Sequence, residues 1–562
     1  MKNRPMLRVA IAQINSTVGD LEGNAAKIIR YATEAKGLGA DIICFPELAL
    51  CGYPPEDLLL KPKFILDNTA AIKELSKNIP GNITAVVGFA NGSLKEAYNS
   101  AAVIYNGKIK GIYRKIFLPN YGVFDEKRYF LAGDKSLVFR QAGITFGVNI
   151  CEDIWHPDGP TKSQAARGAR LILNINASPY YMGKFKQRQA IISNQAKTNG
   201  VFIVYTNLVG GQDELVFDGQ SMIVDNDGKI LGKAKAFSED LLIQDLPVPA
   251  GKTKVSKNII KISDEIQKDK KQLLPKRATE ILEQVPEVYQ ALVLGIRDYV
   301  EKNGFKKVVI GLSGGIDSAI VAGLAVDALG KENVAGLFMP SRYSSKESEE
   351  DAQELAKNLG IRFTTVSIEQ IFKFYLLVLE PHFEGRQRDI TEENLQARIR
   401  GNIMMAFSNK FGWLVLTTGN KSEMSTGYAT LYGDMAGGFA VIKDLTKTLV
   451  YKVARYRNSI NNTIPERIFT KVPTAELKPN QRDQDTLPPY DVLDEILKAY
   501  VEEDKDPLKI ISSGFDKETV YETVAMVDRN EYKRRQSPPG IKITPKAFGR
   551  DRRMPITNKY CG

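Results

Sequence analysis

The sequence predicts an α/β fold divided into two domains. Three observations support this: the length of 562 residues exceeds what one hydrophobic core usually holds, apolar runs of strand length alternate with amphipathic stretches, and a Lys-rich segment poor in aromatics interrupts the alternation. We therefore expect domains at residues 1–247 and 277–562, with a linker at 248–276. A composition of 43% hydrophobic and 25% charged residues is typical of a globular protein and excludes fibrous or disordered classes.

Short apolar runs mark the expected strands of the first domain, and helical stretches lie between some of them. The runs are 7–12, 41–45, 84–89, 101–105, 144–150, 171–175 and 201–205, and the helical stretches include 23–36 and 186–198. Such an alternation indicates an α/β domain with at least one largely buried sheet.

The second domain opens with a helical stretch at 279–302, followed by a strand at 307–312, a Gly-rich loop, a helix at 318–329 and a strand at 334–339. This order is a βαβ unit, the start of a Rossmann-like, doubly wound parallel sheet.

The charge balance favours anionic partners. Lys and Arg total 77 against 66 for Asp and Glu, and residues 529–562 hold ten basic and only two acidic side chains. Nucleotides, phosphates and nucleic acid all fit such an excess, and a solvated basic face is the commonest interpretation of a basic run.

The four cysteines, Cys44, Cys51, Cys151 and Cys561, lack metal-ligand spacing and the density of a disulfide scaffold. We see neither a signal-peptide pattern at the start nor an apolar segment long enough to span a bilayer, and so expect a cytoplasmic protein without a membrane partner. With only two histidines, a His-based zinc site or a Ser-His-Asp triad is not expected.

The Gly-rich loop, Ser-Gly-Gly-Ile-Asp-Ser at 313–318, has the chemistry of a pyrophosphate site. Gly314 and Gly315 let the backbone approach a ligand, and the following helix directs its free N–H groups there. Ser313 and Ser318 add hydroxyl donors, whereas Asp317 is best explained as a ligand of Mg²⁺ bridging phosphates. A tight turn alone explains the glycines but not the serines or the acid.

The loop resembles that of the N-type ATP pyrophosphatases, which cleave ATP between the α and β phosphates and adenylate a substrate oxygen. Four further stretches resemble NAD synthetases: 394–400, 417–423, 427–434 and 533–535. The resemblance implies Mg²⁺ as cofactor and ATP as co-substrate. It implies ATP binding by Gly311, Leu312, Ser313, Gly314, Gly315, Ile316, Asp317, Ser318, Thr418 and Lys447, deamido-NAD binding by Asn394, Glu423 and Lys533, and Mg²⁺ binding by Asp317 and Glu423.

Three reactive side chains follow strand-like runs in the first domain: Glu47, Lys115 and Cys151. Cys151 could be a nucleophile, Glu47 its general base and Lys115 the cation that stabilises a tetrahedral oxyanion. Taken singly, each has a plainer interpretation, as a buried thiol, a strand-end ion pair or a surface charge.

The segments Phe-Pro-Glu at 45–47, Arg-Lys-Ile-Phe-Leu-Pro at 114–119 and Cys-Glu-Asp-Ile-Trp at 151–155 resemble the nitrilase, or carbon–nitrogen hydrolase, superfamily. That resemblance implies an αββα sandwich and amide hydrolysis through a Cys acyl-enzyme. It also implies glutamine binding by Tyr121, Ser178 and Lys184, with Glu126 supporting the site, while Cys44 and Cys51 are expected in the core.

Across nearly its whole length the chain resembles glutamine-dependent NAD synthetases. The expected reaction converts deamido-NAD, ATP, glutamine and water into NAD, AMP, pyrophosphate and glutamate, with small molecules as the only other partners and a homo-oligomeric state. Two alternatives stay open: an amidotransferase with another acceptor, and an RNA-modifying pyrophosphatase that uses the basic tail. Sulfur-inserting members of the latter class need cysteines near the loop, and the second half holds only Cys561.

Overall fold

A computed structural model describes residues 6–93, 96–249, 259–265 and 281–560. Its contacts divide the chain into two compact units, one of residues 1–212 with 216–281 and the other of residues 213–215 with 282–562. The predicted linker contains strand β15 (Ile260–Ser263), which pairs in parallel with β6 (Val138–Gln141), and much of the rest of 248–276 lies outside the described residues. The domain limits themselves stay a prediction.

The first unit contains two mixed sheets. One has the order β14 (Asp240–Leu246), β1 (Leu7–Gln13), β2 (Ile42–Cys44), β3 (Thr84–Gly92), β4 (Ala97–Tyr105), β5 (Lys108–Arg114). The other has the order β13 (Ile230–Lys233), β12 (Met222–Val224), β9 (Phe202–Asn207), β8 (Leu171–Asn176), β7 (Ile144–Ile150), β6, β15. A separate hairpin joins β10 (Val209–Gln212) and β11 (Leu215–Asp218).

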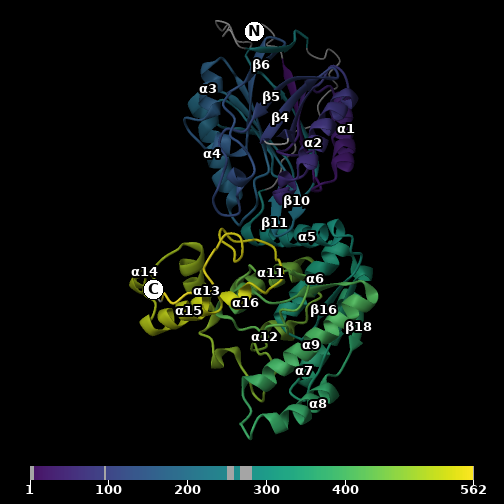
Figure 1. Ribbon diagram of the computed structural model, residues 1–562, viewed down its shortest axis with the longest axis vertical. Coiled ribbons are helices and arrows are strands. Elements are labelled where there is room, and N and C mark those ends of the chain that lie inside the picture. The colour runs from purple at the N-terminus through teal and green to yellow at the C-terminus, as the bar shows by residue number, and fades with distance from the viewer. Residues whose placement is uncertain (1–5, 94–95, 250–258, 266–280, 561–562) are drawn as a thin grey trace. The chain divides into compact units, whose positions relative to one another are not determined.

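Helices cover the outer faces of both sheets, which confirms the predicted αββα sandwich (Figure 1). Helices α1 (Leu21–Gly37) and α2 (Pro62–Asn78) pack on the first sheet, and α4 (Lys184–Asn199) packs on the second, beside α3 (Pro160–Ala166). Strand β1 shows how one strand contributes to both layers of the core. Val9 faces the core between the sheets, whereas its neighbour Ala10 faces the helices, because side chains alternate along a strand.

The second unit is built on a five-stranded, wholly parallel sheet, as predicted. Its order is β18 (Arg362–Thr365), β17 (Val334–Phe338), β16 (Val308–Gly311), β19 (Leu414–Thr417), β20 (Phe439–Ala440). The chain runs outward from β16 in one direction and then returns to place β19 on its other side. Ligands of doubly wound sheets bind at the carboxyl ends of the strands where the order reverses in this way.

Helices pack around this sheet. The longer ones are α5 (Gln284–Lys302), α6 (Ile316–Leu329), α7 (Lys346–Leu359), α8 (Glu369–Leu379), α9 (Ile390–Phe411), α11 (Lys447–Ile460) and α15 (Lys517–Arg529). Shorter helices are α10 (Lys421–Thr426), α12 (Glu466–Thr470), α13 (Tyr490–Leu497), α14 (Pro507–Ser512) and α16 (Glu531–Arg534). The three residues Val308, Val309 and Ile310 of β16 are all buried, as expected of a strand with both faces covered.

The helix predicted at 279–302 begins at Gln284 in the structure. Residues 281–283 are not helical, and residues 279–280 lie outside the described residues. Pro286 explains the late start, since proline is tolerated in the first turn of a helix but not further in. Within the described part of the chain, no helix combines the length and apolar character needed to cross a bilayer.

Candidate active sites

Glu47, Lys115 and Cys151 follow β2, β5 and β7, and the fold brings the first two into contact. Lys115 Nζ lies 2.7 Å from Glu47 Oε1, and both side chains are buried. Strand β5 pairs antiparallel with its neighbour β4. Because β4 is itself antiparallel to β3, β5 nevertheless runs in the same direction as β2, so the two carboxyl ends lie at one edge of the sheet.

Cys151 has a strained backbone. Its φ is 45°, in the left-handed region that non-glycine residues rarely adopt, at the point where β7 gives way to a short 3₁₀ helix. The buried carboxylate of Asp153 fixes this turn, accepting hydrogen bonds from Ile150 N at 3.0 Å, Phe117 N at 2.9 Å and the Tyr113 hydroxyl at 2.7 Å. Asp153 therefore ties the turn at Cys151 to the segment after Lys115.

Each oxygen of the Glu47 carboxylate has its own donors. Oε1 accepts from Asn99 Nδ2 at 2.7 Å as well as from Lys115, and Oε2 accepts from the backbone N–H of Ala177 at 2.8 Å. These donors come from three separate segments of the chain, so the carboxylate is held rigidly.

A second carboxylate, Glu126, lies on the other side of the ammonium group. Its Oε1 accepts from Lys115 Nζ at 2.8 Å and from the Tyr53 hydroxyl at 3.0 Å. Burial raises the pKa of Glu126 to about 7 against the lowering effect of Lys115. Burial also disfavours the charged form of Lys115. The negative charges of Glu126 and Glu47 outweigh this effect of burial and hold the pKa of Lys115 well above its usual value.

Burial, followed by the charge of Glu47, raises the pKa of the Cys151 thiol well above its ordinary value, and Lys115 opposes the rise only in part. The resting thiol is thus protonated at neutral pH. A thiolate has to be generated as the sulfur attacks, with a proton acceptor in the same enclosed site.

The three predicted glutamine-binding residues contact or adjoin residues of the segments that form this centre. The Tyr121 hydroxyl donates to Glu152 Oε2 at 2.9 Å, and its side chain is 58% exposed. Ser178 follows Ala177, whose N–H binds Glu47, and is buried. Lys184 starts α4 with its ammonium 4.2 Å from the centre of the Trp155 ring, and burial lowers its pKa to about 8.

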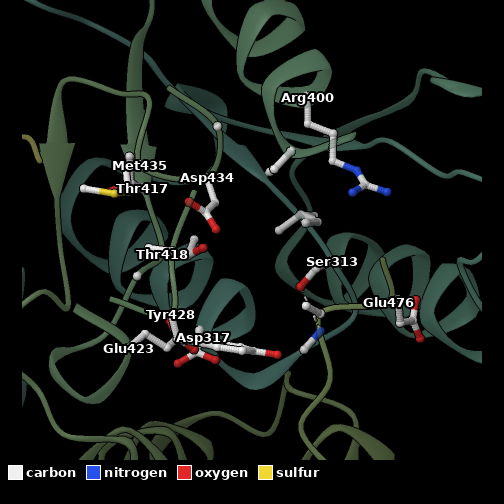
Figure 2. Close-up of a pocket in the computed structure, with 18 of the residues that line it drawn as sticks. Ser313, Asp317, Arg400, Thr417, Thr418, Glu423, Tyr428, Asp434, Met435 and Glu476 are labelled. Carbon is white, nitrogen blue, oxygen red and sulfur yellow. Dashed lines mark hydrogen bonds between the residues drawn. The ribbon is translucent and has the colours of Figure 1, made fainter. Parts of the chain in front are cut away.

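In the second unit a cavity of about 320 Å³ opens at the carboxyl ends of β16 and β19 (Figure 2). It is lined by the predicted residues Gly311, Leu312, Ser313, Gly315, Ile316, Asp317, Thr418, Glu423 and Lys447, whereas Gly314 and Ser318 do not line it. Ser313 and Arg400 lie on one side of the cavity, with Thr418 and Glu423 on the other (Figure 2).

Gly314 and Ser318 shape the loop from within. Gly314 has φ +76°, and a Cβ there would lie 2.5 Å from the carbonyl oxygen of Ser348. The Ser318 hydroxyl donates to Gly315 O at 3.1 Å and lies 3.1 Å from Ser313 Oγ, so it is engaged inside the loop.

Lys447 lies between two carboxylates. Its Nζ is 2.5 Å from Asp317 Oδ2 and 3.6 Å from Glu423 Oε1, and Asp317 Oδ1 accepts from Asn420 Nδ2 at 3.0 Å. Burial, and then the charge of Asp317, raise the pKa of Glu423 to about 8. Two carboxylates that repel each other in this way fit a divalent cation, although nowhere among the described residues do three or more His, Cys, Asp or Glu side chains form a ready metal site. The remaining ligands of Mg²⁺ would have to come from phosphates and water.

Asn394 and Lys533 do not line the cavity but hold one of its walls. Asn394 Oδ1 accepts from the Thr430 hydroxyl at 2.7 Å, and Lys533 Nζ donates to the carbonyls of Gly427 at 2.7 Å and Ala429 at 3.0 Å. The segment between these contacts includes Ala429, which lines the cavity. Their binding of deamido-NAD stays a prediction.

The sequence analysis gave no individual role to several residues that shape the sites. In the first unit these are Asn99 and Asp153, and in the second they are Arg400 and Glu476, which line the cavity. Burial lowers the pKa of Arg400 to about 10, and its Nε–H donates to Met339 O at 2.9 Å. Asp153 and Arg400 lie within the family-like stretches 151–155 and 394–400, whereas for Asn99 the available signal is a polar residue in an apolar strand.

Comparison with known proteins assigns each unit to a class. The carbon–nitrogen hydrolase family model matches residues 8–253, and the NAD synthase family model matches residues 288–537. Fold and sites together thus define an enzyme that combines a carbon–nitrogen hydrolase with an NAD synthase.

Full-length relatives narrow this class. The chain is 51% identical to the glutamine-dependent NAD(+) synthetase of Thermotoga maritima over 99% of both chains, and 49% identical to that of Aquifex aeolicus over 99% of this chain and 100% of the other. A solved structure of glutamine-dependent NAD+ synthetase from Acinetobacter baumannii in complex with ADP superposes with a TM-score of 0.76 at 44% identity, covering 99% of each chain. The chain belongs to the glutamine-dependent NAD(+) synthetase family.

Proposed function

We propose that this enzyme amidates deamido-NAD to NAD with nitrogen released from glutamine, consuming ATP and giving AMP, pyrophosphate and glutamate. The observation that carries the proposal is that one chain holds both a buried Glu47–Lys115–Cys151 centre and a cavity formed by the loop at 313–318. The first centre makes ammonia and the second consumes it.

In the first unit, Cys151 attacks the side-chain amide of glutamine while Glu47 accepts the thiol proton. The ammonium of Lys115 stabilises the oxyanion of the tetrahedral intermediate. When this intermediate collapses, the C–N bond breaks, the nitrogen takes up a proton and leaves as ammonia, and the acyl-enzyme is hydrolysed to glutamate. Tyr121, Ser178 and Lys184 hold the rest of the glutamine.

In the second unit, the loop at 311–318 with Thr418 and Lys447 binds ATP, while Asn394, Glu423 and Lys533 serve deamido-NAD. The nicotinate carboxylate attacks the α phosphorus, pyrophosphate leaves, and ammonia then displaces AMP from the acyl-adenylate. Asp317 and Glu423 would hold Mg²⁺, which when bound offsets the charge of the pyrophosphate. The free N–H groups at the start of α6 add positive potential at the same place.

The proposal extends to a cytoplasmic homo-oligomer that binds neither nucleic acid nor membranes. In support, several cations of the basic tail are internally paired: Arg534 with Glu531, Lys542 with Asp551 and Arg552 with Asp528. RNA binding that weakens steeply with salt would argue for the RNA-modifying alternative instead.

Chromatography of the wild-type protein incubated with Mg²⁺, ATP, glutamine and deamido-NAD tests the function. We expect NAD and AMP to appear in equal amounts. The Asp317→Ala variant should form AMP at least about 100-fold more slowly, as when a main electrostatic contact of a transition state is lost. AMP without NAD, or a dependence on another acceptor, would overturn the assignment.

A further inference from the structure

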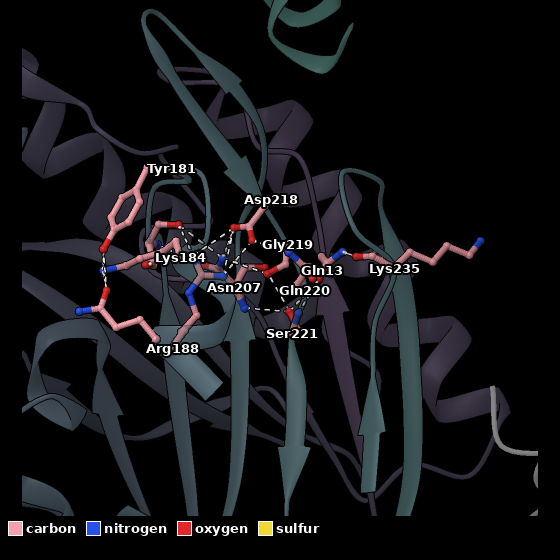
Figure 3. Close-up of polar contacts among 12 residues, drawn as sticks. Gln13, Tyr181, Lys184, Arg188, Asn207, Asp218, Gly219, Gln220, Ser221 and Lys235 are labelled. Atoms are coloured by element: carbon pink, nitrogen blue, oxygen red, sulfur yellow. Dashed lines mark hydrogen bonds and ion pairs between the residues drawn. The ribbon is translucent and has the colours of Figure 1, made fainter. Parts of the chain in front are cut away.

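A buried ion pair joins Arg188 and Asp218 (Figure 3). Arg188 also contacts Ser178 of the proposed glutamine site. Arg188, on α4, donates from Nη1 to both oxygens of Asp218, at 3.1 and 3.0 Å, and from Nη2 to Oδ1 at 3.1 Å. The side chains of Arg188 and Asp218 are only 1% and 0% exposed. Asp218 ends β11, and its second oxygen also accepts from Gln220 Nε2 at 2.8 Å.

Stability alone is a poor explanation for this pair. Removing two charges from water is energetically costly, and a buried pair often stabilises a fold no better than apolar side chains of similar size. Moreover, Arg188 Nε is buried without a hydrogen-bond partner among the described residues, so the pair is not arranged for maximal bonding. The geometry of the Arg188–Asp218 pair instead indicates that it orients a neighbouring residue.

That neighbour is Ser178. Arg188 Nη2 lies 3.4 Å from both the carbonyl oxygen and the hydroxyl of Ser178. On the other side, Asn207 Oδ1 accepts the Ser178 N–H at 2.9 Å, while Asn207 Nδ2 donates to Gly219 O at 3.0 Å and lies 3.4 Å from Asp218 Oδ1. One hydrogen-bond network therefore contacts the backbone N–H, the carbonyl oxygen and the hydroxyl group of Ser178.

The network is anchored far from the site. The backbone N–H of Asn207 donates to Ser221 Oγ at 2.9 Å, and Ser221 Oγ donates to Gln13 Oε1 at 2.9 Å. Gln13 Nε2 in turn donates to the carbonyls of Lys235 and Ser238, each at 2.7 Å (Figure 3). Because every hydrogen bond of this network is buried or partly buried, Ser178 has little freedom to move.

We propose that Arg188, Asp218 and Asn207 are positioning residues that set the affinity for glutamine by fixing Ser178. The inference rests on the proposed glutaminase function. It assigns these residues no part in bond making, so their loss should weaken glutamine binding more than turnover.

The test compares two double variants. Arg188→Gln with Asp218→Asn removes both charges together, which leaves no unpaired buried ion. Arg8→Gln with Asp245→Asn does the same to a second Arg–Asp pair of this unit. Arg8 is buried, its Nε lies 2.9 Å from Asp245 Oδ1, and the two residues belong to the paired strands β1 and β14. The latter is the matched control for loss of a structural ion pair.

We expect the first double variant to raise KM for glutamine at least tenfold, with kcat within threefold and ammonium-dependent NAD synthesis unchanged, while the control alters none of these. Asn207→Ala keeps the ion pair but removes the acceptor of the Ser178 N–H and the donor to Gly219 O. It should raise KM in the same direction, and it tests the inference if the double variant does not fold. An unchanged KM, or an equal loss with ammonium, would overturn the inference.

Labelling of Cys151 gives an independent readout. A glutamine-shaped electrophile, 6-diazo-5-oxo-L-norleucine, should label the Arg188→Gln, Asp218→Asn variant at least tenfold more slowly than wild type, whereas iodoacetamide should label both equally. Equal slowing of both reagents would overturn the inference, since it would place the defect at the thiol. A wild type that cannot use glutamine would instead reject the proposed function itself.

Discussion

Lys115 determines the charge balance of the first site. Its ammonium lies between Glu47 and Glu126, at 2.7 and 2.8 Å, with all three groups buried. Burial raises the pKa of Glu126 against the lowering effect of Lys115. Glu126 and Glu47 together hold the pKa of Lys115 well above its usual value, so the ammonium stays charged beside the proposed base.

A pH-dependent affinity for glutamine follows from Lys184. Its pKa is lowered to about 8 by burial, so its cationic fraction falls as pH rises through that value. If the ammonium holds the carboxylate of glutamine, KM should rise roughly eightfold between about pH 7.5 and 9. Steady-state kinetics at saturating ATP and deamido-NAD measures this change.

Arginine at the same position supplies the control, because a guanidinium stays charged throughout this range. Lys184→Arg should flatten the rise in KM, although ionisation of the substrate's own amine affects both proteins alike. A wild-type KM that does not change with pH would remove Lys184 from the carboxylate site.

Among the elements, the turn between β16 and α6 forms part of the proposed ATP site. Gly314 is required twice over, by its φ of +76° and by the closeness of the Ser348 carbonyl, at 2.5 Å from where a Cβ would be. The chain leaving β16 therefore passes close to α7, and the amino end of α6 lies at the cavity. Neither requirement depends on a bound ligand.

Gly314→Ala should raise KM for ATP at least about tenfold with ammonium as nitrogen donor, because the loop must shift to relieve a strain of about 1–3 kcal/mol. Gly304→Ala is the matched control in the same unit: its φ is +78°, but no atom lies within 4 Å of an added Cβ. It should lower the free energy of unfolding by about 1 kcal/mol and leave ATP kinetics unchanged. An unaltered KM for ATP in Gly314→Ala would contradict the role of the turn.

At the scale of the whole molecule, both fold classes and the residues of the two centres could be predicted because each signal is local. Cys151 ends an apolar run, and Gly314 belongs to a six-residue motif. The roles of Asn99 and Asp153 could not be predicted, since each role depends on which strands become neighbours. The pairing of β1 with β14, whose residues Leu7 and Leu246 lie opposite each other, has no local signal either.

The same reason explains the differences at the second site. Asn394 and Lys533 belong to stretches with a strong family resemblance, yet in the fold both contact the segment 427–430 rather than the cavity. A motif identifies a residue as part of a site but does not show which groups it touches. Ser318 shows this on a smaller scale, because its hydroxyl is engaged within the loop.

In the proposed reaction, two separate centres on one chain supply and consume ammonia. The decisive experiment measures NAD synthesis by the Cys151→Ala variant with either glutamine or ammonium as nitrogen source. We predict that NAD formation from glutamine is abolished, whereas formation from ammonium stays within about twofold of wild type because the second unit holds its own complete site. NAD formation from glutamine at the wild-type rate, or loss of both activities, would contradict the claim.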